Sequence, residues 1–181
     1  TATVATGSHS ETLDGVISGA GQLAKNGNGT LTLSGDNSYS GGTLLNAGEI
    51  DVGSNTALGT GTLTMSSAAS NQTTLGFTAN NLEIANNIAL ADIPTSGVNA
   101  IMVVDTGSYD ETLNGVISGD GTVVKRRDCT LTLNGASTYT GITGLAEGQL
   151  NVGNDTALGG STLAMVDGTT LGFSSDNLNI A

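Results

Sequence analysis

The chain of 181 residues is long enough for a sizeable core, yet it has 28 glycines, no tryptophan, one proline and 3% aromatic residues. Its core must therefore be assembled from many layers of Leu, Ile and Val. The net charge of −12, from 16 acidic and 4 basic residues, opposes binding to nucleic acid and to anionic membranes, because few side chains can displace counterions from phosphates.

Short segments in which apolar and polar residues alternate predict β-strands. Each segment places two apolar side chains on one face and a polar or small residue on the other, which is the period of a strand. In chain order they are Leu31-Thr32-Leu33, Ile50-Asp51-Val52, Leu63-Thr64-Met65, Leu75-Gly76-Phe77 and Leu82-Glu83-Ile84. Clusters of Gly, Asn, Asp and Ser between them, such as residues 35–38, predict turns. No segment sustains a helical spacing with caps, so we expect an all-β chain.

The sequence repeats itself after 100 positions. The matched stretches are 6–8 with 106–108, 11–13 with 111–113, 15–19 with 115–119, 30–33 with 130–133 and 56–59 with 156–159, and Lys25, Tyr39 and Met65 recur as Lys125, Tyr139 and Met165. Such self-similarity predicts stacked units of one architecture. We expect a single segment over residues 1–181 that consists of two tandem units, 6–105 and 106–181, the second of them truncated.

The two copies differ in length after Met65. The first copy has four extra residues near 66–69, because Leu75-Gly76-Phe77 aligns with Leu171-Gly172-Phe173 at an offset of 96. A length change that the repeat tolerates predicts a surface loop at this point.

Many short strands are compatible with a sandwich, a barrel or a solenoid. Hairpin signals of the two-residue Asn-Gly kind between adjacent strands are few, and the repeat period is long. Both facts favour a right-handed, single-stranded parallel β-helix, in which each strand pairs with its counterpart one coil along and inward aliphatic residues stack into ladders. With about 20–25 residues per coil, we expect about eight coils and a rod about 40 Å long.

One stretch of the sequence resembles a known family. The residues GAGQLAKNGNGTLTLSG at 19–35 and NSYSGGT at 37–43 resemble the passenger-associated transport repeat of autotransporter passengers, which has the pattern G-x-G-x-L-x-K-x-G-x-G-T-L-T-L-x-G-x-N-x-Y-x-G-x-T. The match covers about 25 residues and occurs twice, which is rare in random glycine-rich sequence. The second copy departs at 126–129, where the pattern expects glycines. We expect strain there, because Cys129 takes a positive backbone angle less readily than Gly29.

The resemblance implies a passenger that is exported across the outer membrane by a C-terminal barrel of the full-length chain and is displayed on the bacterial cell surface. It implies a non-enzymatic segment that acts in adhesion or self-association, with a second copy or a host or matrix surface ligand as partner. Outward Thr, Ser, Asn and Asp side chains would form polar ladders that pair head to tail with the same face of another molecule, and many weak contacts would act together. The alternatives are a passive β-helical stalk that aids export and displays another domain and, less favoured, a β-helix enzyme that acts on polysaccharides.

The sequence assigns no catalytic, cofactor-binding or metal-binding residue. We interpret His9, the only histidine, as a surface or edge residue, since its repeat counterpart is Tyr109. No G-x-S-x-G nucleophile elbow and no calcium-binding loop occurs. The carboxylates are scattered and we interpret them as solvated outward positions; examples are Asp36, Glu49, Asp51, Glu83 and Asp92.

Two further features concern charge and thiol chemistry. Lys125-Arg126-Arg127 holds three of the four positive charges, and we interpret it as a solvated turn. Cys129 is the only cysteine, which excludes an internal disulfide or a thiolate metal cluster, and we interpret it as a substituted turn residue rather than a reactive thiol. No apolar run is long enough to cross a bilayer, so we expect no direct membrane insertion. The first residues lack the features of a signal peptide, so we expect any secretion signal to lie outside this sequence.

Overall fold

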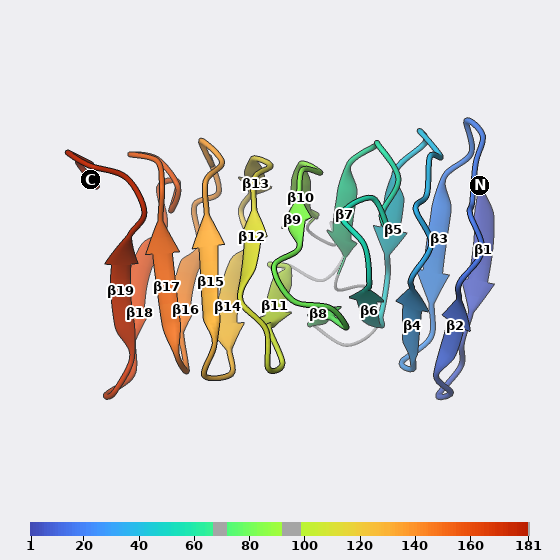
Figure 1. Ribbon diagram of the computed structural model, residues 1–181, viewed down its shortest axis with the longest axis horizontal. Helices are drawn as coiled ribbons and strands as arrows, with labels where there is room; N and C mark the ends of the chain where they lie inside the picture. The colour runs from blue at the N-terminus through green and yellow to red at the C-terminus, as the bar shows by residue number, and fades with distance from the viewer. Residues whose placement is uncertain (67–71, 92–98, 181) are drawn as a thin grey trace.

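The computed structural model describes residues 1–66, 72–91 and 99–180. Over these residues the chain is a parallel β-helix whose coils stack along one axis, as Figure 1 shows from the N-terminus on the right to the C-terminus on the left. This confirms the expected fold. The loop predicted near 66–69 lies, apart from Ser66, outside the described residues, and so does Asp92. The described part contains no helix long and apolar enough to cross a membrane.

Three parallel sheets, named here A, B and C, run along the rod and contain six, eight and five strands. Sheet A consists of β1 (Ala2–Ala5), β3 (Leu23–Asn26), β5 (Thr43–Leu45), β7 (Leu63–Ser66), β10 (Ile88–Ala91) and β13 (Ile117–Gly119). Sheet B consists of β2 (Glu11–Leu13), β4 (Thr30–Leu33), β6 (Gly48–Val52), β8 (Thr73–Phe77), β11 (Ile101–Asp105), β14 (Thr122–Arg126), β16 (Ile142–Leu145) and β18 (Thr162–Met165). Sheet C consists of β9 (Glu83–Ile84), β12 (Glu111–Leu113), β15 (Thr130–Leu133), β17 (Gln149–Val152) and β19 (Thr170–Phe173).

The sequence pattern located these strands correctly. All five predicted segments coincide with strands, namely β4, β6, β7, β8 and β9. Each coil contributes one strand to the eight-stranded sheet B, which agrees with the expected number of coils. The division into units 6–105 and 106–181 stays a prediction.

The interior is a narrow stack of aliphatic side chains. In sheet B, in-register pairing places Leu31, Ile50, Leu75 and Val104 one above the other, and all four are completely buried. The alternation along each strand sends these residues inward and the intervening polar ones outward. Each fully buried aliphatic side chain contributes about 1.5–3 kcal/mol, so the stack is stabilised coil by coil.

The third side of the first coils has no regular strand, but its backbone still pairs between coils. The amide of Ser38 donates to the carbonyl of Ile17 at 2.9 Å. Residues 35–38, predicted as a turn, therefore begin this third side, and the side chain of Asn37 is buried. Asn37 does not lie in the predicted turn but in this irregular side. The same residue types, Gly, Asn, Asp and Ser, are found in turns and in irregular segments, so the sequence did not distinguish the two.

Strands at equivalent positions of the two repeats belong to different sheets. β4 and β6 lie in sheet B, whereas their counterparts β15 and β17 lie in sheet C. In sheet A, β13 lies four strands beyond β3, and each strand marks one coil. The repeat counterpart of β3 is not β13 but the next strand of the chain, β14, which belongs to sheet B. One repeat therefore contains four coils and one additional side.

Longer coils near the middle of the rod accommodate the additional side. Hydrogen bonds between neighbouring coils join residues 20 apart at Asn26 and Asn46 and again at Asn114 and Asn134. Around the middle, such hydrogen bonds join residues that are farther apart in the chain: Asn86 and Gly59 are 27 apart, and Asn114 and Glu83 are 31 apart.

Equivalent strands nevertheless lie on the same side of the rod. In Figure 1, β2 and β4 near the N-terminus and β15, β17 and β19 near the C-terminus lie nearer the viewer, in front of β1 and β3 and of β14, β16 and β18. The stack therefore twists about its axis, as sheets of twisted strands do. Near the C-terminus, sheet C lies on the side of the rod that sheet B occupies near the N-terminus. The additional side of each repeat compensates for this twist.

Neighbouring coils approach closely at Gly115. A Cβ atom added there would collide with the carbonyl oxygen of Asn86 and lie 2.8 Å from the amide nitrogen of Asn87. The counterpart Gly15, in the first coil, has nothing within 4 Å of the same position. One repeat position is thus constrained in one copy and free in the other.

We expect Gly115→Ala to lower the free energy of unfolding by about 2 kcal/mol, because the added methyl group pushes two coils apart. Gly15→Ala is the matched control and should change it by less than about 0.5 kcal/mol. Urea unfolding followed by circular dichroism measures both, and equal effects would contradict the packing described here.

Candidate functional site

The residues singled out in the sequence are dispersed over the structure. His9 is exposed in a turn of the first coil, as predicted, and Tyr109 at the equivalent position is partly buried. Among the described residues no group of three or more His, Cys, Asp or Glu side chains is arranged to hold a metal ion. Of the carboxylates named above, the structure brings together Glu49 and Asp51, while Asp36 and Glu83 lie apart from them.

Lys25, a residue of the repeat motif, points into the interior and is completely buried. Its ammonium group donates to the carbonyl oxygens of Gly27 at 2.7 Å and Ala47 at 3.1 Å. Burial lowers the pKa of Lys25, and the nearby negative charge of Glu49 partly opposes this shift. The ammonium thus satisfies carbonyl groups at the corner of two successive coils.

Lys125 has the same role in the second repeat. It is 1% exposed, and its ammonium donates to the carbonyl oxygens of Arg126 at 2.9 Å and Arg127 at 2.5 Å. The solvated turn predicted for Lys125-Arg126-Arg127 is therefore wrong for Lys125, because backbone carbonyls replace water around its charge. Arg126 and Arg127 are exposed, as predicted.

The strain expected at Cys129 lies at Arg127 instead. Arg127 has a φ of 73°, and its counterpart Gly27 has a φ of 89°, whereas Cys129 is partly buried and has no positive φ. Asp105 pairs with the Arg127 guanidinium at 3.1 Å, and the carboxylate of Glu147 accepts the Arg127 amide at 2.9 Å. These contacts hold the left-handed backbone that glycine adopts more easily.

Tyr39 and Thr43 of the motif also lie in the interior. Tyr39 is buried, and its hydroxyl lies 2.5 Å from that of Thr43, which donates to the carbonyl of Leu58 at 3.1 Å. Tyr139 and Thr143 repeat the pair at 2.5 Å. The recurring Lys, Tyr and buried Thr of the motif are therefore architectural, so a surface for partners must be built from the outward side chains, which include Thr30 and Thr32 of the motif.

Outward side chains form a surface that we call the polar strip. They belong to β2, β4, β6 and β8 and to the counterparts of these strands, β12, β15, β17 and β19. In the first repeat it consists of Thr12, Thr30, Thr32, Glu49, Asp51 and Thr74, and in the second of the equivalent Thr112, Thr130, Thr132, Gln149, Asn151 and Thr170. Within each repeat these residues are aligned by in-register pairing of the strands, as in Thr32 with Asp51 and Thr132 with Asn151. The strip therefore presents regular rows of hydroxyl, carboxyl and amide groups.

The two halves of the strip share a geometry but differ in charge. Glu49 and Asp51 lie over Gly76, where an added Cβ would meet the Asp51 carboxylate and lie 2.9 Å from Glu49 Oε1. In the second repeat Gln149 Nε2 donates to Asn151 Oδ1 at 2.7 Å above Gly172. An acid pair in one repeat is thus an amide pair in the other.

Asp51 of the acid pair has a raised pKa. Burial, the charge of Glu49, a hydrogen bond with Glu49 and the charge of Asp105, in decreasing order of effect, together raise the pKa of Asp51 to about 6. The amide pair of the second repeat avoids this cost, because Gln149 supplies the donor that a second carboxylate lacks.

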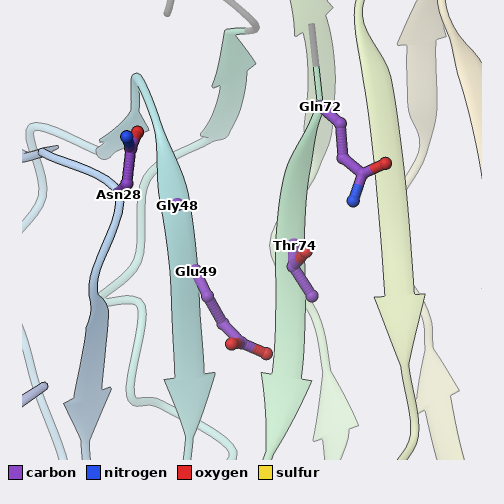
Figure 2. Close-up of a pocket in the computed structure, with 5 residues that line it drawn as sticks. All are labelled: Asn28, Gly48, Glu49, Gln72 and Thr74. Carbon is purple, nitrogen blue, oxygen red and sulfur yellow. The ribbon is translucent and has the colours of Figure 1, made fainter. Parts of the chain in front are cut away.

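A shallow hollow of about 390 Å³ opens on the first half of the strip and is lined by Asn28, Gly48, Glu49, Gln72 and Thr74 (Figure 2). Figure 2 shows Glu49 extending from β6 towards β8, with Asn28 on the preceding turn. A second hollow of about 330 Å³ lies on the second half, lined by Asn81, Glu83, Asp110, Glu111, Thr112, Thr130, Thr132 and Asn151. Such polar, shallow surfaces are suited to hydrogen bonding with a partner surface.

Comparison with known proteins gives two matches. The model of the passenger-associated transport repeat matches residues 23–52 and 130–152. The adhesin BmaC autotransporter of Brucella suis biovar 1 (strain 1330) is 35% identical over 141 residues, which is 77% of this chain. The chain spans 4% of the length of that relative. No solved structure matches.

We expect Lys25→Met to lower the free energy of unfolding by about 2 kcal/mol. The substitution keeps the apolar stem but leaves the carbonyls of Gly27 and Ala47 without the ammonium donor. Arg126→Met removes the same charge from an exposed position and should have little effect. Chemical unfolding measures both variants, and equal stabilities would contradict the role of the buried ammonium.

We expect the variant E49Q/D51N to be more stable than the parent at pH 7.5 by about 1 kcal/mol, a value that allows for solvent screening of a partly exposed group. A carboxyl whose folded pKa of about 6 exceeds its unfolded value stabilises the fold at low pH and loses this contribution as pH rises through 6. The gain should therefore shrink at pH 4. Asp36→Asn is the control, and a gain that does not depend on pH would argue against the paired carboxylates.

Proposed function

Because the chain belongs to the autotransporter passengers that carry the passenger-associated transport repeat, we propose that it is a non-enzymatic segment of a surface adhesin. In this proposal the full-length chain has a C-terminal outer-membrane barrel and displays the segment outside the cell. The Brucella relative is an adhesin by name, which supports an adhesive rather than an enzymatic role.

One observation carries the proposal. Lys25, Tyr39 and Thr43 of the motif are buried and hold the coils together. Thr30 and Thr32 of the motif belong instead to the polar strip, and the strands that carry the strip lie on the same side of the rod near both ends. A one-sided strip of many weak hydrogen-bonding groups is suited to an extended contact, in which single contacts add up. A passive stalk does not require the strip to stay on one side, although the rigid rod itself suits that alternative.

A second copy of the chain is the partner that the strip fits best. Two rods can lie antiparallel, so that the head of each is beside the tail of the other. We call this the head-to-tail arrangement; a two-fold axis then places the first repeat of each rod opposite the second repeat of the other. The carboxylates of Glu49 and Asp51 then face the amides of Gln149 and Asn151, which donate hydrogen bonds. If two rods lie side by side in parallel, four carboxylates face one another, and like charges in an interface are costly.

We expect Q149E/N151D to weaken self-association of the segment about tenfold or more, because carboxylates then face carboxylates in the head-to-tail pair. Adding E49Q/D51N to the same chain should restore it. Thr3→Glu/Thr64→Asp adds the same two charges to sheet A and should weaken association much less. Sedimentation equilibrium measures the dissociation constants. A parent protein that stays monomeric at all concentrations would favour the stalk.

Cysteine cross-linking tests the orientation in a Cys129→Ser background. We expect disulfide-linked pairs only when Thr32→Cys and Thr170→Cys proteins are mixed, because these positions oppose each other in the head-to-tail arrangement. Pairs formed within each single variant would show a parallel contact instead.

A further inference from the structure

In sheet C the strands that meet at the junction between the two repeats pair over a short length, whereas β11 and β14 pair through five residues in sheet B. β9 pairs with β12 through two residue pairs, Thr112 with Glu83 and Leu113 with Ile84. Elsewhere in sheet C, neighbouring strands pair through three or four residues. The longest coils meet at the same point, where Thr112 stands in register with Glu83, 29 residues earlier.

Glu111 lies inside the rod at this junction. It is 2% exposed and stands in register with Leu131 of the next coil. Its Oε2 atom accepts the amide of Leu82 at 2.8 Å, whereas Oε1 has no hydrogen-bond partner among the described residues. A buried carboxyl with one unpaired oxygen is tolerable when it is protonated and costly when it is charged.

No cation from the strands packed against Glu111 balances its charge. Asp110 precedes it in the chain, Glu83 lies outward on β9, and β15 carries only threonine and leucine. The counterpart Glu11, in the first coil, is exposed. The same residue type therefore lies in water in one repeat and inside the stack in the other.

We propose that Glu111 makes the junction between the repeats a pH-dependent joint of the rod. The protonated side chain holds β9 and β12 together, and its ionisation loosens their contact. Glu111 also lines the hollow on the second half of the polar strip, but the proposed joint does not require that the strip binds a second copy.

The direction of the effect follows from linkage. The pKa of Glu111 is raised to about 7, mainly by burial; the hydrogen bond from Leu82 partly opposes this shift, and the charge of Asp110 adds to it. Since the folded pKa exceeds the open-state value, the stabilising contribution is complete at low pH and is lost as pH rises through 7. The joint is therefore tight in acid and looser in mild alkali.

Hydrogen exchange of single amides tests the proposal. The amides of Thr112 and Asn114 donate to Leu82 and Ile84 across the junction at 2.9 and 2.8 Å. After correction for the intrinsic exchange rate, we expect their opening to increase about tenfold between pH 6 and pH 8.5. The amide of Gly53, bonded to Leu33 between two earlier coils, should show no comparable increase.

Variants at the two equivalent positions complete the test. Glu111→Gln should abolish the pH dependence at the junction, and Glu111→Leu, which copies the leucine at 131, serves as a second neutral variant should the first fail to fold. Glu11→Gln should leave it unchanged. A pH dependence that is equal in all coils, or that persists in both Glu111 variants, would overturn the proposal. Monomeric behaviour of the protein would affect only the proposed self-association.

Discussion

The structure depends on parallel backbone hydrogen bonding from coil to coil around an interior only a few side chains wide. Inward polar groups in so narrow an interior are costly unless they form hydrogen bonds, and most of the side chains there are aliphatic. Lys25 and Tyr39 form such hydrogen bonds, with an ammonium on two carbonyls and a hydroxyl chain that ends on a carbonyl. This explains physically why Lys25 and Tyr39 recur at fixed spacing: they are parts of the interior, and their polar groups lead to backbone carbonyls at the corners of the coils.

The outward side chains are free of this requirement, and the two repeats show it. Glu49 and Asp51 become Gln149 and Asn151 with the backbone geometry and the underlying glycine unchanged. An exchange of carboxylate for amide alters the charge and the donors of the surface without disturbing the stack. The solenoid therefore separates the residues that build the rod from those that decide what the rod contacts, and recognition can diverge from one repeat to the next.

The sequence predicted the strands and the parallel stack because both leave a periodic trace, of two residues in a strand such as Leu31-Thr32-Leu33 and of 100 residues in the chain. It misplaced Lys125 because a lysine beside two arginines resembles a solvated turn, and nothing in the alternation indicates that carbonyls surround its ammonium. It placed the backbone strain at Cys129 rather than Arg127 because the motif expects glycine at both positions and only the structure shows which one needs a positive φ. The pairing of Glu49 with Asp51 was also missed, although the spacing of two in a predicted strand places both on one face.

The change of sheet between the repeats was beyond sequence reasoning, since a period of 100 residues does not say how many sides one coil has. That change links two features which seem unrelated. A twisted stack keeps equivalent strips on one side only if each repeat gains an additional side, and the longer coils in the middle supply it. Lengthening the coils there shortens β9 and reduces its pairing with β12, and the buried atoms without partners in the described part, Thr73 Oγ1 and Glu111 Oε1, both lie in these coils. The short pairing of β9 with β12 thus coincides with the longer coils that keep the polar strip on one side of the rod.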